Sequence, residues 1–587
     1  MEKWFLANKK ADFSAIAERF NITPITAKII RNRDIIDDAD IEKFLHGGLF
    51  DLHDPALMKD MDILIDILSG EIKEGKKIRV VQDYDVDGCM SGFILVSAIR
   101  ECGGDADYDV PDRTSEGYGI NDRIVDCALR DGISTIITCD NGIAAADIVE
   151  RAIEKGIKVI VTDHHEVQYT EENGKINYII PPAQAVVDPK RPDCPYPFKF
   201  LCGAGIAYKT AQLLYKKFGI DDKKLHSLLQ YAAVATVCDI VDLTDENRII
   251  VKEGFKALEE TENFGMRALL DRCLKEGEKI SVGRVGFFVG PVINAGGRMS
   301  TAQLVMKLLF SASRNEAESI LDELIYLNEE RKKATEDAVD IIKKKYELAP
   351  PSDDVIIEYN PLCHESVAGI AAGRIKDIYY KPTIVLTDSE DEGYIKGSAR
   401  SVEGFDIFER ILGVSDLLSR FGGHPMAAGL TLKKSNLEEF IRRMNEPPWP
   451  EEAERFKRVT IDAAVVFSAL SRQAVDELEL IEPCGKGNRK PVFAAKNLKV
   501  EKIFIMGKNR NAVKLILNDG TASAEGLWFG DADKLLDDVR DRYGEENCQR
   551  LLKGLDSGIK ADIVYTPKIN RYNGFERIQL DISSFRW

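Results

Sequence analysis

The chain has 587 residues, of which 44% are hydrophobic and 30% charged, and its formal net charge is −18. This length predicts three or four domains of roughly 150 residues each, and the ordinary composition excludes a disordered or collagen-like protein. The negative charge argues against a general nucleic-acid coat protein, but it allows an enzyme that grips nucleic acid in a local groove and gathers carboxylates around metal ions.

No apolar run approaches the roughly 18 residues that span a bilayer, and charged residues interrupt the start MEKWFLANKKADF, unlike a signal peptide. The 11 cysteines include no CxxC pair, which argues against a zinc finger and against a disulfide framework. We therefore expect a cytoplasmic protein with reduced thiols and no membrane partner.

The sequence of residues 1–49 predicts a helical segment with breaks at Pro24 and at Gly47-Gly48. From about residue 77, short apolar runs alternate with amphipathic stretches, in the order KKIRVVQD, SGFILVSAIREC, STIITCD, NGIAAADIVERAIEKG and KVIVTDHH. This alternation predicts right-handed crossovers and a parallel sheet, in which functional residues gather at the carboxyl ends of strands near a switch point. Each predicted strand ends in Asp or in Asp-His-His.

Residues 314–347 hold no Gly or Pro and carry an apolar stripe, which predicts one long helix connecting two domains. A second α/β region follows, with strands DVIIEY and KPTIVLTD around the helix VAGIAAGRIKDIYY, and NEPPWPEEAE (445–454) is a predicted linker. Short alternating strands then predict a small β-barrel. Because the chain stops soon after this barrel, we expect no further C-terminal domain.

These patterns divide the chain into a helical lead (1–49), a first α/β domain (50–313), the connecting helix (314–349), a second α/β domain (350–445) and a β-barrel (455–587). Between Cys484 and Gly520 the barrel segment carries nine Lys and Arg against two acidic residues, a net of +7. Such a surface suits a phosphate backbone, although a solvated basic face is the alternative.

The strongest local signal is the sequence DYDVDG, which contains Asp83, Asp85 and Asp87. Three carboxylates at alternate positions cannot lie close together in ionised form without a cation, and a solvated acidic turn is the alternative. An EF-hand is excluded because the twelfth position of a loop starting at Asp83 is Ile94 instead of Glu, and because a strand precedes the loop.

Three further signals follow in the chain: Asp140 in TCDNGI, Asp163-His164-His165 in TDHHE, and Asp239 in ATVCDIVDL. Of two adjacent histidines at a strand end, one can ligate a metal while the other donates a proton, although an ordinary loop is equally compatible with the pair alone. Asp140 and Asp239 each close an apolar, strand-like run. An isolated Asp239 would most often be a helix cap or a carboxylate at the edge of the core.

The candidate ligands offer only carboxylate oxygen and imidazole nitrogen, and they are Asp83, Asp85, Asp87, Asp140, His164 and Asp239. Without thiolates, this set suits Mn²⁺ or Mg²⁺ better than structural Zn²⁺. Two ions about 3.5–4 Å apart would use six donors well, since such a pair activates water and clamps a phosphoryl group. The sequence therefore predicts hydrolysis of a phosphoester or phosphoanhydride.

The motifs DYDVDG, TCDNGI, TDHHE and VATVCDIVDL, in this order, resemble the DHH phosphoesterase superfamily. The segments EGYGI, YPFKFLCGAGIAYK, GPVINAGGRM, KGSARSVEGFD, FGGHPMAAGL and EPCGKGN are similar to the RecJ family. That family consists of single-strand-specific exonucleases that degrade DNA 5′ to 3′ in repair and recombination. The resemblance implies a parallel-sheet DHH domain, an α/β DHH-associated domain and an OB-like C-terminal barrel, and it extends from about residue 20 nearly to the end.

The resemblance also assigns residues by position. The six candidate ligands match the metal positions of the family, His165 matches its catalytic histidine, and Asp163 is placed with His165 in the catalytic group. The resemblance implies substrate-binding roles for Arg113 and Tyr118 at the DNA end, Arg298 on a phosphate, Ser398 and Arg400 on a terminal 5′-phosphate, and His424 of the GGH motif.

From the residues alone, Arg113 and Tyr118 could form an ordinary surface turn, and His424 could be a capping histidine. The chain also departs from the family pattern, because Gln82 stands where glycine is expected and Cys484 where an aromatic residue is usual. The segment GAGIAYKT resembles a Walker A loop, but Tyr208 replaces its last glycine, so we do not expect nucleotide triphosphate hydrolysis.

Two other functions compete with a DNA exonuclease. A DHH enzyme acting on short oligoribonucleotides, cyclic dinucleotides or pyrophosphate would not need the roughly 130 residues that follow the second α/β domain. A non-catalytic DNA-binding scaffold would require lost ligands, and here all six are present. The expected partners are single-stranded DNA and, by resemblance, a single-strand-binding protein and a helicase; we expect a monomer.

Overall fold

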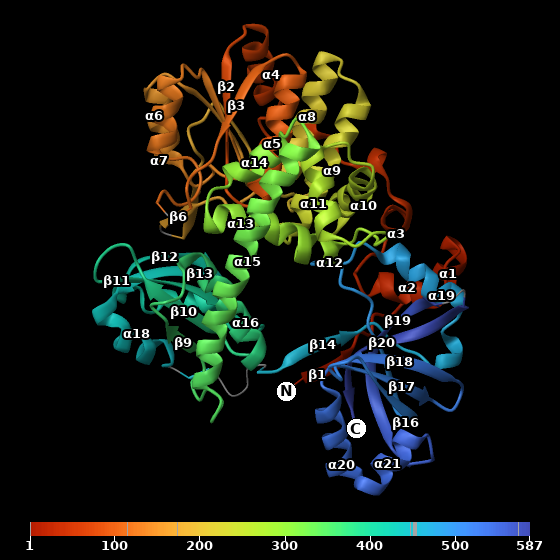
Figure 1. The fold of residues 1–587 in the computed structure, drawn as a ribbon. Coiled ribbons are helices and arrows are strands. Elements are labelled where there is room, and N and C mark those ends of the chain that lie inside the picture. The colour runs from red at the N-terminus through yellow and green to blue at the C-terminus, as the bar shows by residue number, and fades with distance from the viewer. Residues whose placement is uncertain (1, 114, 173, 447, 450–454, 573–574) are drawn as a thin grey trace. The chain divides into compact units, whose positions relative to one another are not determined.

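The computed structural model describes residues 2–113, 115–172, 174–446, 448–449, 455–572 and 575–587. The chain forms two compact units, and Figure 1 shows their elements. The larger unit is Leu52–Lys457, and the smaller unit combines Glu2–Asp51 with Arg458–Trp587. None of the helices in these ranges is long and apolar enough to cross a membrane.

The first domain of the larger unit is built on a five-stranded parallel sheet in the order β3-β2-β4-β5-β8. Its strands are β2 (Lys77–Gln82), β3 (Asp105–Asp109), β4 (Thr135–Cys139), β5 (Lys158–Thr162) and β8 (Ala185–Val187). The chain runs from β2 to β3 on one side and then to β4 on the other side of β2. The switch point, where ligands bind in such sheets, therefore lies between β2 and β4.

Helices α4 (Met61–Lys73), α5 (Val86–Glu101), α6 (Asp122–Arg130) and α7 (Ala146–Glu154) alternate with these strands, and the hairpin β6 (Tyr169–Glu172) with β7 (Lys175–Tyr178) follows β5. The predicted parallel sheet is thus confirmed. Its central strands are buried on both faces, as helices on the two sides require, and this explains why β2, β4 and β5 are continuous apolar runs.

A helical layer completes this domain with α8 (Gly203–Phe218), α9 (Asp222–Cys238), α10 (Asp245–Glu259), α11 (Phe264–Cys273), α12 (Val282–Arg284), the π-helical turn η3 (Val285–Val289), α13 (Gly290–Met299) and α14 (Gln303–Leu309). The run before Asp239 is helical, so the expectation of a strand there is wrong. The alanines of YAAVATVC favour a helix, and a short buried apolar run does not by itself distinguish the two structures.

Helix α15 (Arg314–Lys345) begins at the cap Ser313, whose hydroxyl accepts the amide of Glu316, and leads to the second domain. That domain has a mixed sheet in the order β12-β13-β11-β10-β9. Its elements are β9 (Ile356–Tyr359), α16 (Glu365–Tyr379), β10 (Thr383–Asp388), β11 (Tyr394–Arg400), α17 (Ile407–Leu412), β12 (Leu418–His424), β13 (Ala427–Lys433) and α18 (Leu437–Met444). Most of the linker predicted at 445–454 lies outside the described residues.

The smaller unit contains a closed barrel of β16 (Phe493–Met506), β17 (Ala512–Asn518), β18 (Ser523–Phe529), β20 (Phe575–Arg586) and β19 (Lys560–Tyr572), in that spatial order, with β19 pairing back onto β16. Strands β18 and β20 pair in parallel. Helices α20 (Ala532–Tyr543) and α21 (Glu545–Lys553) lie between β18 and β19 in the chain. This five-stranded ring confirms the expected OB-like barrel.

The N-terminal segment belongs to the same unit. It comprises β1 (Glu2–Leu6), α1 (Phe13–Phe20), α2 (Pro24–Arg31) and α3 (Asp38–His46), and β1 pairs with β14 (Lys457–Ile461). The short elements β15 (Ala463–Ala464) and α19 (Arg472–Asp476) precede the barrel. Ile29, Ile30 and Leu45 of the N-terminal helices lie in one hydrophobic core with Phe493 and Leu498 of the barrel.

Candidate active site

The loop after β2 carries the first three candidate ligands. Asp83 is buried, Asp85 caps α5 by accepting the amide of Gly88 at 3.1 Å, and Asp87 lies in the first turn of that helix. A Cβ added at position 88 would lie 2.4 Å from the carbonyl oxygen of Asp83. Only glycine therefore lets the loop fold this tightly around its carboxylates.

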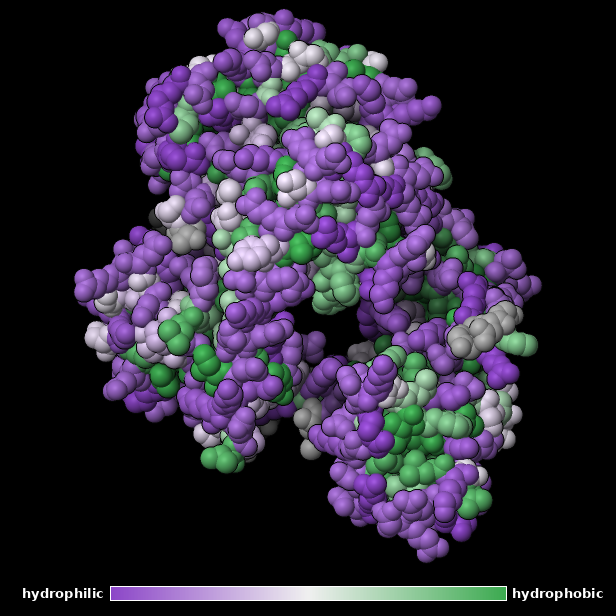
Figure 2. Space-filling view, viewed as in Figure 1, coloured by the Kyte–Doolittle hydropathy of each residue, from purple (hydrophilic) through white to green (hydrophobic). Residues whose placement is uncertain are grey.

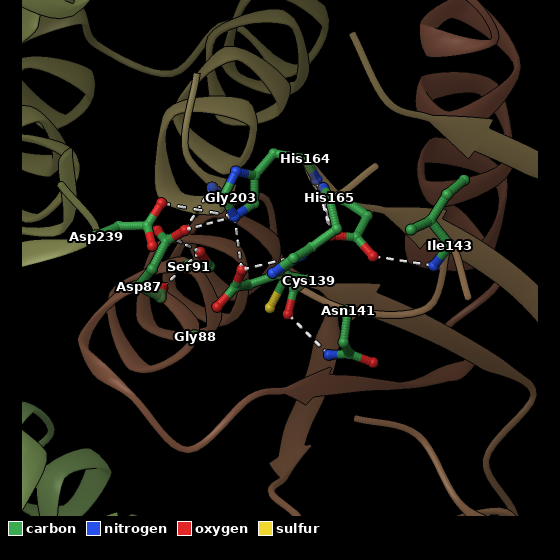
Figure 3. Close-up of polar contacts among 12 residues, drawn as sticks. Asp87, Gly88, Ser91, Cys139, Asn141, Ile143, His164, His165, Gly203 and Asp239 are labelled. Carbon is green, nitrogen blue, oxygen red and sulfur yellow. Dashed lines mark hydrogen bonds and ion pairs between the residues drawn. The ribbon is translucent and has the colours of Figure 1, made fainter. Parts of the chain in front are cut away.

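His164, after β5, is the point at which the other elements meet. Its Nε2 atom lies 3.0 Å from Asp140 Oδ1, 3.5 Å from Asp87 Oδ2 and 3.7 Å from Asp239 Oδ2. Figure 3 shows the His164 ring facing Asp87 and Asp239. His164 is thus the meeting point of the carboxyl ends of β4 and β5, the end of α9 and the start of α5.

The six candidate ligands fall into two groups. In each, one ligand atom per residue lies within 4.8 Å of the others; the groups are Asp83 with Asp85 and Asp140, and Asp87 with His164 and Asp239. A third group within the same limit joins Asp140 to His164 and His165.

The electrostatics of this cluster fit divalent cations. Burial, with the charges of neighbouring aspartates, raises the pKa of Asp83 and Asp140 well above the usual range and that of Asp239 to about 8. The buried Oδ1 atom of Asp83 has no hydrogen-bond partner among the described residues. Burial lowers the pKa of His164 to about 4, so its imidazole is neutral, as a metal ligand must be. The donor set therefore fits Mn²⁺ or Mg²⁺.

His165 is held by Asp163. Its Nδ1 atom donates to Asp163 Oδ1 at 2.7 Å, and the same carboxylate accepts the backbone amides of Ile143, His164 and His165. Burial opposes the charged form of His165, but the hydrogen bond and charge of Asp163 outweigh it and raise its pKa to about 9. Asp163 is 1% exposed, so its carboxylate is covered and the more exposed partner in this pair is His165.

Tyr118 lies beside the same histidine. Its hydroxyl donates to the backbone carbonyl of Asp140 and lies 3.1 Å from His165 Nδ1, and the two rings meet edge to face at 5.5 Å. About half of the tyrosine is exposed, so one part of the ring remains available to a substrate.

The segment that resembles a Walker A loop has a different role. It begins α8, and the backbone amides of Gly203 and Ala204 donate to the two carboxylate oxygens of Asp87 at 2.6 and 2.8 Å. The amides that would hold a phosphate are thus occupied by a carboxylate that belongs to the metal cluster. The structure agrees with the exclusion of a nucleotide-phosphate loop.

The departure at Gln82 is accommodated by a second glycine. The Gln82 side chain is fully buried at the end of β2, and a Cβ at Gly92 of α5 would lie 1.9 Å from its Oε1 atom. A larger residue in α5 would therefore expel this amide.

Two residues near the cluster were missed from sequence. Asp188 follows β8 at the same sheet edge and is fully buried, and Lys190 pairs with the exposed Glu166 at 2.9 Å. The positive charge of Lys190 adds to the effect of burial on the pKa of His164 and partly offsets the rise in the pKa of Asp239, so Lys190 lies near the cluster. The apolar run before Asp188 spans only three residues, so the strand-then-Asp signal was too short to detect.

Asp188 gives a pH-dependent prediction. Burial, with the charge of Asp163, raises its pKa to about 8, so the folded protein holds a proton that the unfolded chain releases. Stability should therefore fall as pH rises between about 4 and 8. We expect Asp188→Asn to raise the melting temperature in metal-free buffer, with a gain that grows from about pH 5 to pH 8 and corresponds to a few kcal/mol. Scanning calorimetry measures this, and an equal gain at both pH values would contradict it.

Arginines lie between the two domains of the larger unit. The guanidinium of Arg113 stacks 4.8 Å from the ring centroid of Tyr84, and Arg298 Nη1 donates to the carbonyl of Ser366 at 2.9 Å. Burial lowers the pKa of Arg298 to about 10, and the charges of Arg113 and of Arg331 on α15 add to this. Arg331, which sequence analysis missed, has no carboxylate partner among the described residues, and an anion would relieve this crowding.

The remaining predicted substrate residues share one face of the second sheet. A Cβ at Gly369 of α16 would lie 2.8 Å from Arg400 Nη2 and 3.4 Å from Ser398 Cβ, so both side chains face this helix. Arg400 and His424 are each in register with Ala427 on the strand between them. The structure thus brings Ser398, Arg400 and His424 together.

The basic segment of the barrel is less charged in three dimensions than in sequence. Arg489 pairs with Asp462 at 2.6 Å, Arg510 with Asp533 at 2.7 Å, and Lys499 with Asp556 at 3.1 Å, and these acids lie outside the segment. Lys502 and Lys514 lie beside the ring of Phe504, with Nζ atoms 4.6 and 4.9 Å from its centroid, and Lys514 also pairs with Glu525 at 3.8 Å. Figure 2 shows hydrophobic side chains at the surface in the area of β16 and β17, and Phe529 is 65% exposed.

Three family models match the chain. The DHH family N-terminal domain matches residues 77–236, the DHHA1 domain matches residues 352–447, and the RecJ OB domain matches residues 461–584. The single-stranded-DNA-specific exonuclease RecJ of Bacillus subtilis (strain 168) is 32% identical over 583 residues, which cover 99% of this chain and 70% of that protein. RecJ of Escherichia coli (strain K12) is 30% identical over 494 residues, which cover 80% and 83%.

Two solved structures of RecJ proteins are similar to this one. The crystal structure of RecJ from Thermus thermophilus in complex with Mn²⁺ covers all of this chain and 80% of that one, with a TM-score of 0.80 at 24% identity. The crystal structure of exonuclease RecJ bound to manganese covers 66% of this chain and 94% of that one, with a TM-score of 0.56 at 30% identity.

Proposed function

The chain belongs to the RecJ family, and from this premise we propose that it is a two-metal phosphodiesterase that degrades single-stranded DNA from its 5′ end, in DNA repair and recombination. The observation that carries the proposal is the convergence of six carboxylate and imidazole donors at the switch point of the parallel sheet. Mn²⁺ or Mg²⁺ ions bound there would activate water and neutralise the charge of the attacked phosphate.

The other residues of the site would orient the DNA strand and protonate the oxygen that leaves. Asp163 fixes the His165 ring through Nδ1 and keeps it cationic, so His165 can donate a hydrogen bond or a proton to the oxygen that leaves. Tyr118 stands beside it and offers a ring face to the terminal base. Arg113 and Arg298 would bind backbone phosphate. Ser398, Arg400 and His424 would hold the terminal 5′-phosphate, and their positions on one face of the second sheet support this assignment.

The barrel supplies a second contact with single strands. Phe504 between two lysines, together with the exposed Phe529, combines ring faces with positive charge. This combination suits unpaired bases and their phosphates without sequence preference, and OB folds bind oligonucleotides with such surfaces.

End-labelled oligonucleotides test the proposal. We expect DNA single strands to be shortened from the 5′ end in Mn²⁺ or Mg²⁺ and to stay intact in EDTA. Duplexes of the same sequence should resist. Preferential cleavage of short oligoribonucleotides or cyclic dinucleotides would instead support another DHH phosphoesterase activity.

Substitutions of His164 and His165 should have different effects on metal binding and rate. We expect His164→Ala to weaken Mn²⁺ binding, measured by calorimetry, and to regain part of its rate at high Mn²⁺, because it removes a ligand. His165→Ala should bind Mn²⁺ normally and lose about 100-fold or more in rate, without rescue, because it removes the acid. Identical Mn²⁺ affinity and identical rescue in the two variants would show that the roles are assigned wrongly.

The wider setting is also a proposal. Single strands in cells are covered by single-strand-binding protein and produced by helicases, so both are candidate partners of an enzyme with this substrate. We propose a monomer that works in the cytoplasm. Light scattering and co-purification with the two partner classes would test these points.

A further inference from the structure

One face of the second sheet continues beyond the proposed 5′-phosphate site. Along β11, Lys396, Ser398 and Arg400 occupy alternate positions on the face toward α16, and Ile395 and Ala399 on the opposite face are buried. Lys396 Nζ lies 3.2 Å from a carboxylate oxygen of Glu365 in the first turn of that helix. The three polar side chains therefore form a line along the strand.

The neighbouring strands extend this line into three rows. Successive rows lie about 7 Å apart, since two residues of a strand advance by that length. In Cα register across β11, β13 and β12, the rows are Arg400, Ala427 and His424; then Ser398, Gly429 and Gly422; then Lys396, Thr431 and Arg420.

Electrostatic interactions connect Arg400, in the first of these rows, with the loop that carries Asp83 and Asp85. Burial lowers the pKa of Arg400, and the positive charge of Arg113 contributes. Arg113 in turn stacks on Tyr84, which lies between Asp83 and Asp85. Arg400 is thus linked to the loop that carries Asp83 and Asp85, and we place the Lys396 row, two residue pairs further along the strands, on the other side of the terminal phosphate.

A cavity of about 360 Å³ opens at this far row, and Lys396, Ser398, Arg420, Thr431, Thr387 and Glu365 contribute to its lining. Its volume lies within the range of small-ligand sites, about 300–1,000 Å³. Arg420 forms no ion pair with a described residue, and the two cations outnumber the single carboxylate. A strand that ends in a monophosphate would leave this space unused.

We propose that this cavity receives the β- and γ-phosphoryl groups of a 5′-triphosphorylated strand. The inference rests on the proposed function, because the α-phosphate would take the position between Ser398 and Arg400. Arg420 and Lys396 would then contact the outer phosphates, and Lys396 would exchange Glu365 for them. The substrate class is a strand whose first nucleotide keeps the triphosphate left by de novo chain initiation.

The reaction is the one proposed above. Water attacks the phosphorus of the first phosphodiester, and the bond from that phosphorus to the 3′-oxygen breaks. The first product leaves as a nucleoside 5′-triphosphate with a 3′-hydroxyl, and the shortened strand keeps a 5′-monophosphate. No further reactant is needed, and chromatography distinguishes the nucleoside triphosphate from a monophosphate.

The test compares three otherwise identical single strands ending in 5′-hydroxyl, 5′-monophosphate or 5′-triphosphate. We expect wild-type protein to degrade the triphosphorylated strand at least as efficiently as the monophosphorylated one, with a nucleoside triphosphate as first product. Arg420→Gln should lower kcat/KM about tenfold or more for the triphosphorylated strand only, because a charge-assisted contact is lost. Arg442→Gln, which removes an exposed cation of α18 in the same domain, should change nothing.

Two results would overturn the inference alone: a triphosphorylated strand used no better than the hydroxyl strand while the monophosphate is preferred, or equal losses on all three strands in Arg420→Gln. Failure of the proposed 5′-phosphate site looks different. In that case wild-type protein would not prefer monophosphate over hydroxyl, or Arg400→Ala would leave the preference unchanged, and the inference would fall with it.

Discussion

Asp140→Asn is expected to lower the rate of single-strand hydrolysis by at least about 100-fold, or roughly 2.7 kcal/mol of barrier. Asp140 belongs to two of the three possible ligand groups and lies 3.0 Å from His164, so its charge serves the whole cluster. Its φ angle is 60°, a conformation that Asn tolerates as well as Asp, so the substitution keeps the backbone and removes only the charge.

The same substitution should stabilise the protein without metal. Burial and four neighbouring aspartates disfavour the charged form of Asp140, and an amide removes this penalty. We therefore expect a lower rate together with a higher melting temperature in EDTA. Asp105→Ala, at the exposed start of β3, is the control and should change neither quantity. If the Asp140→Asn variant kept more than about a tenth of the wild-type rate, the assignment of Asp140 as a metal ligand would be wrong.

Gly88→Ala is expected to damage the site without touching a ligand. The added Cβ would lie 2.4 to 2.7 Å from three backbone atoms of Asp83, so the loop must move. We expect a loss of rate of about 100-fold, weaker Mn²⁺ binding, and a destabilisation of about 1–3 kcal/mol, as overpacking usually causes. Activity assays, calorimetry and thermal unfolding measure the three effects.

Gly70→Ala provides the matched control for this substitution. Gly70 lies inside α4, and a Cβ there would meet no atom within 4 Å. Alanine should stabilise that helix by about 0.5–1 kcal/mol and leave the rate unchanged. Equal activity in Gly88→Ala and Gly70→Ala would show that the loop of the first three aspartates does not need its tight geometry.

Much of the fold and of the site was predictable because the relevant signals are local. Apolar runs that end in Asp predicted the strands before Asp83 and Asp140 and the parallel sheet, and parallel strands bring their carboxyl ends to one edge. The absence of Gly and Pro predicted α15, and alternation predicted the barrel strands. Residue types at these ends also predicted the kind of metal, since carboxylate and imidazole donors without thiolates suit Mn²⁺ or Mg²⁺.

The tertiary structure decided what depends on neighbours distant in the sequence. It placed Asp239 at the end of a helix and added the buried Asp188. It neutralised much of the basic barrel segment with acids from elsewhere, such as Asp462 on Arg489. Local periodicity fixes which residues form an element, because each repeat depends on adjacent side chains. Charge pairing, burial and the partners of a side chain depend on packing between elements, which no local pattern encodes.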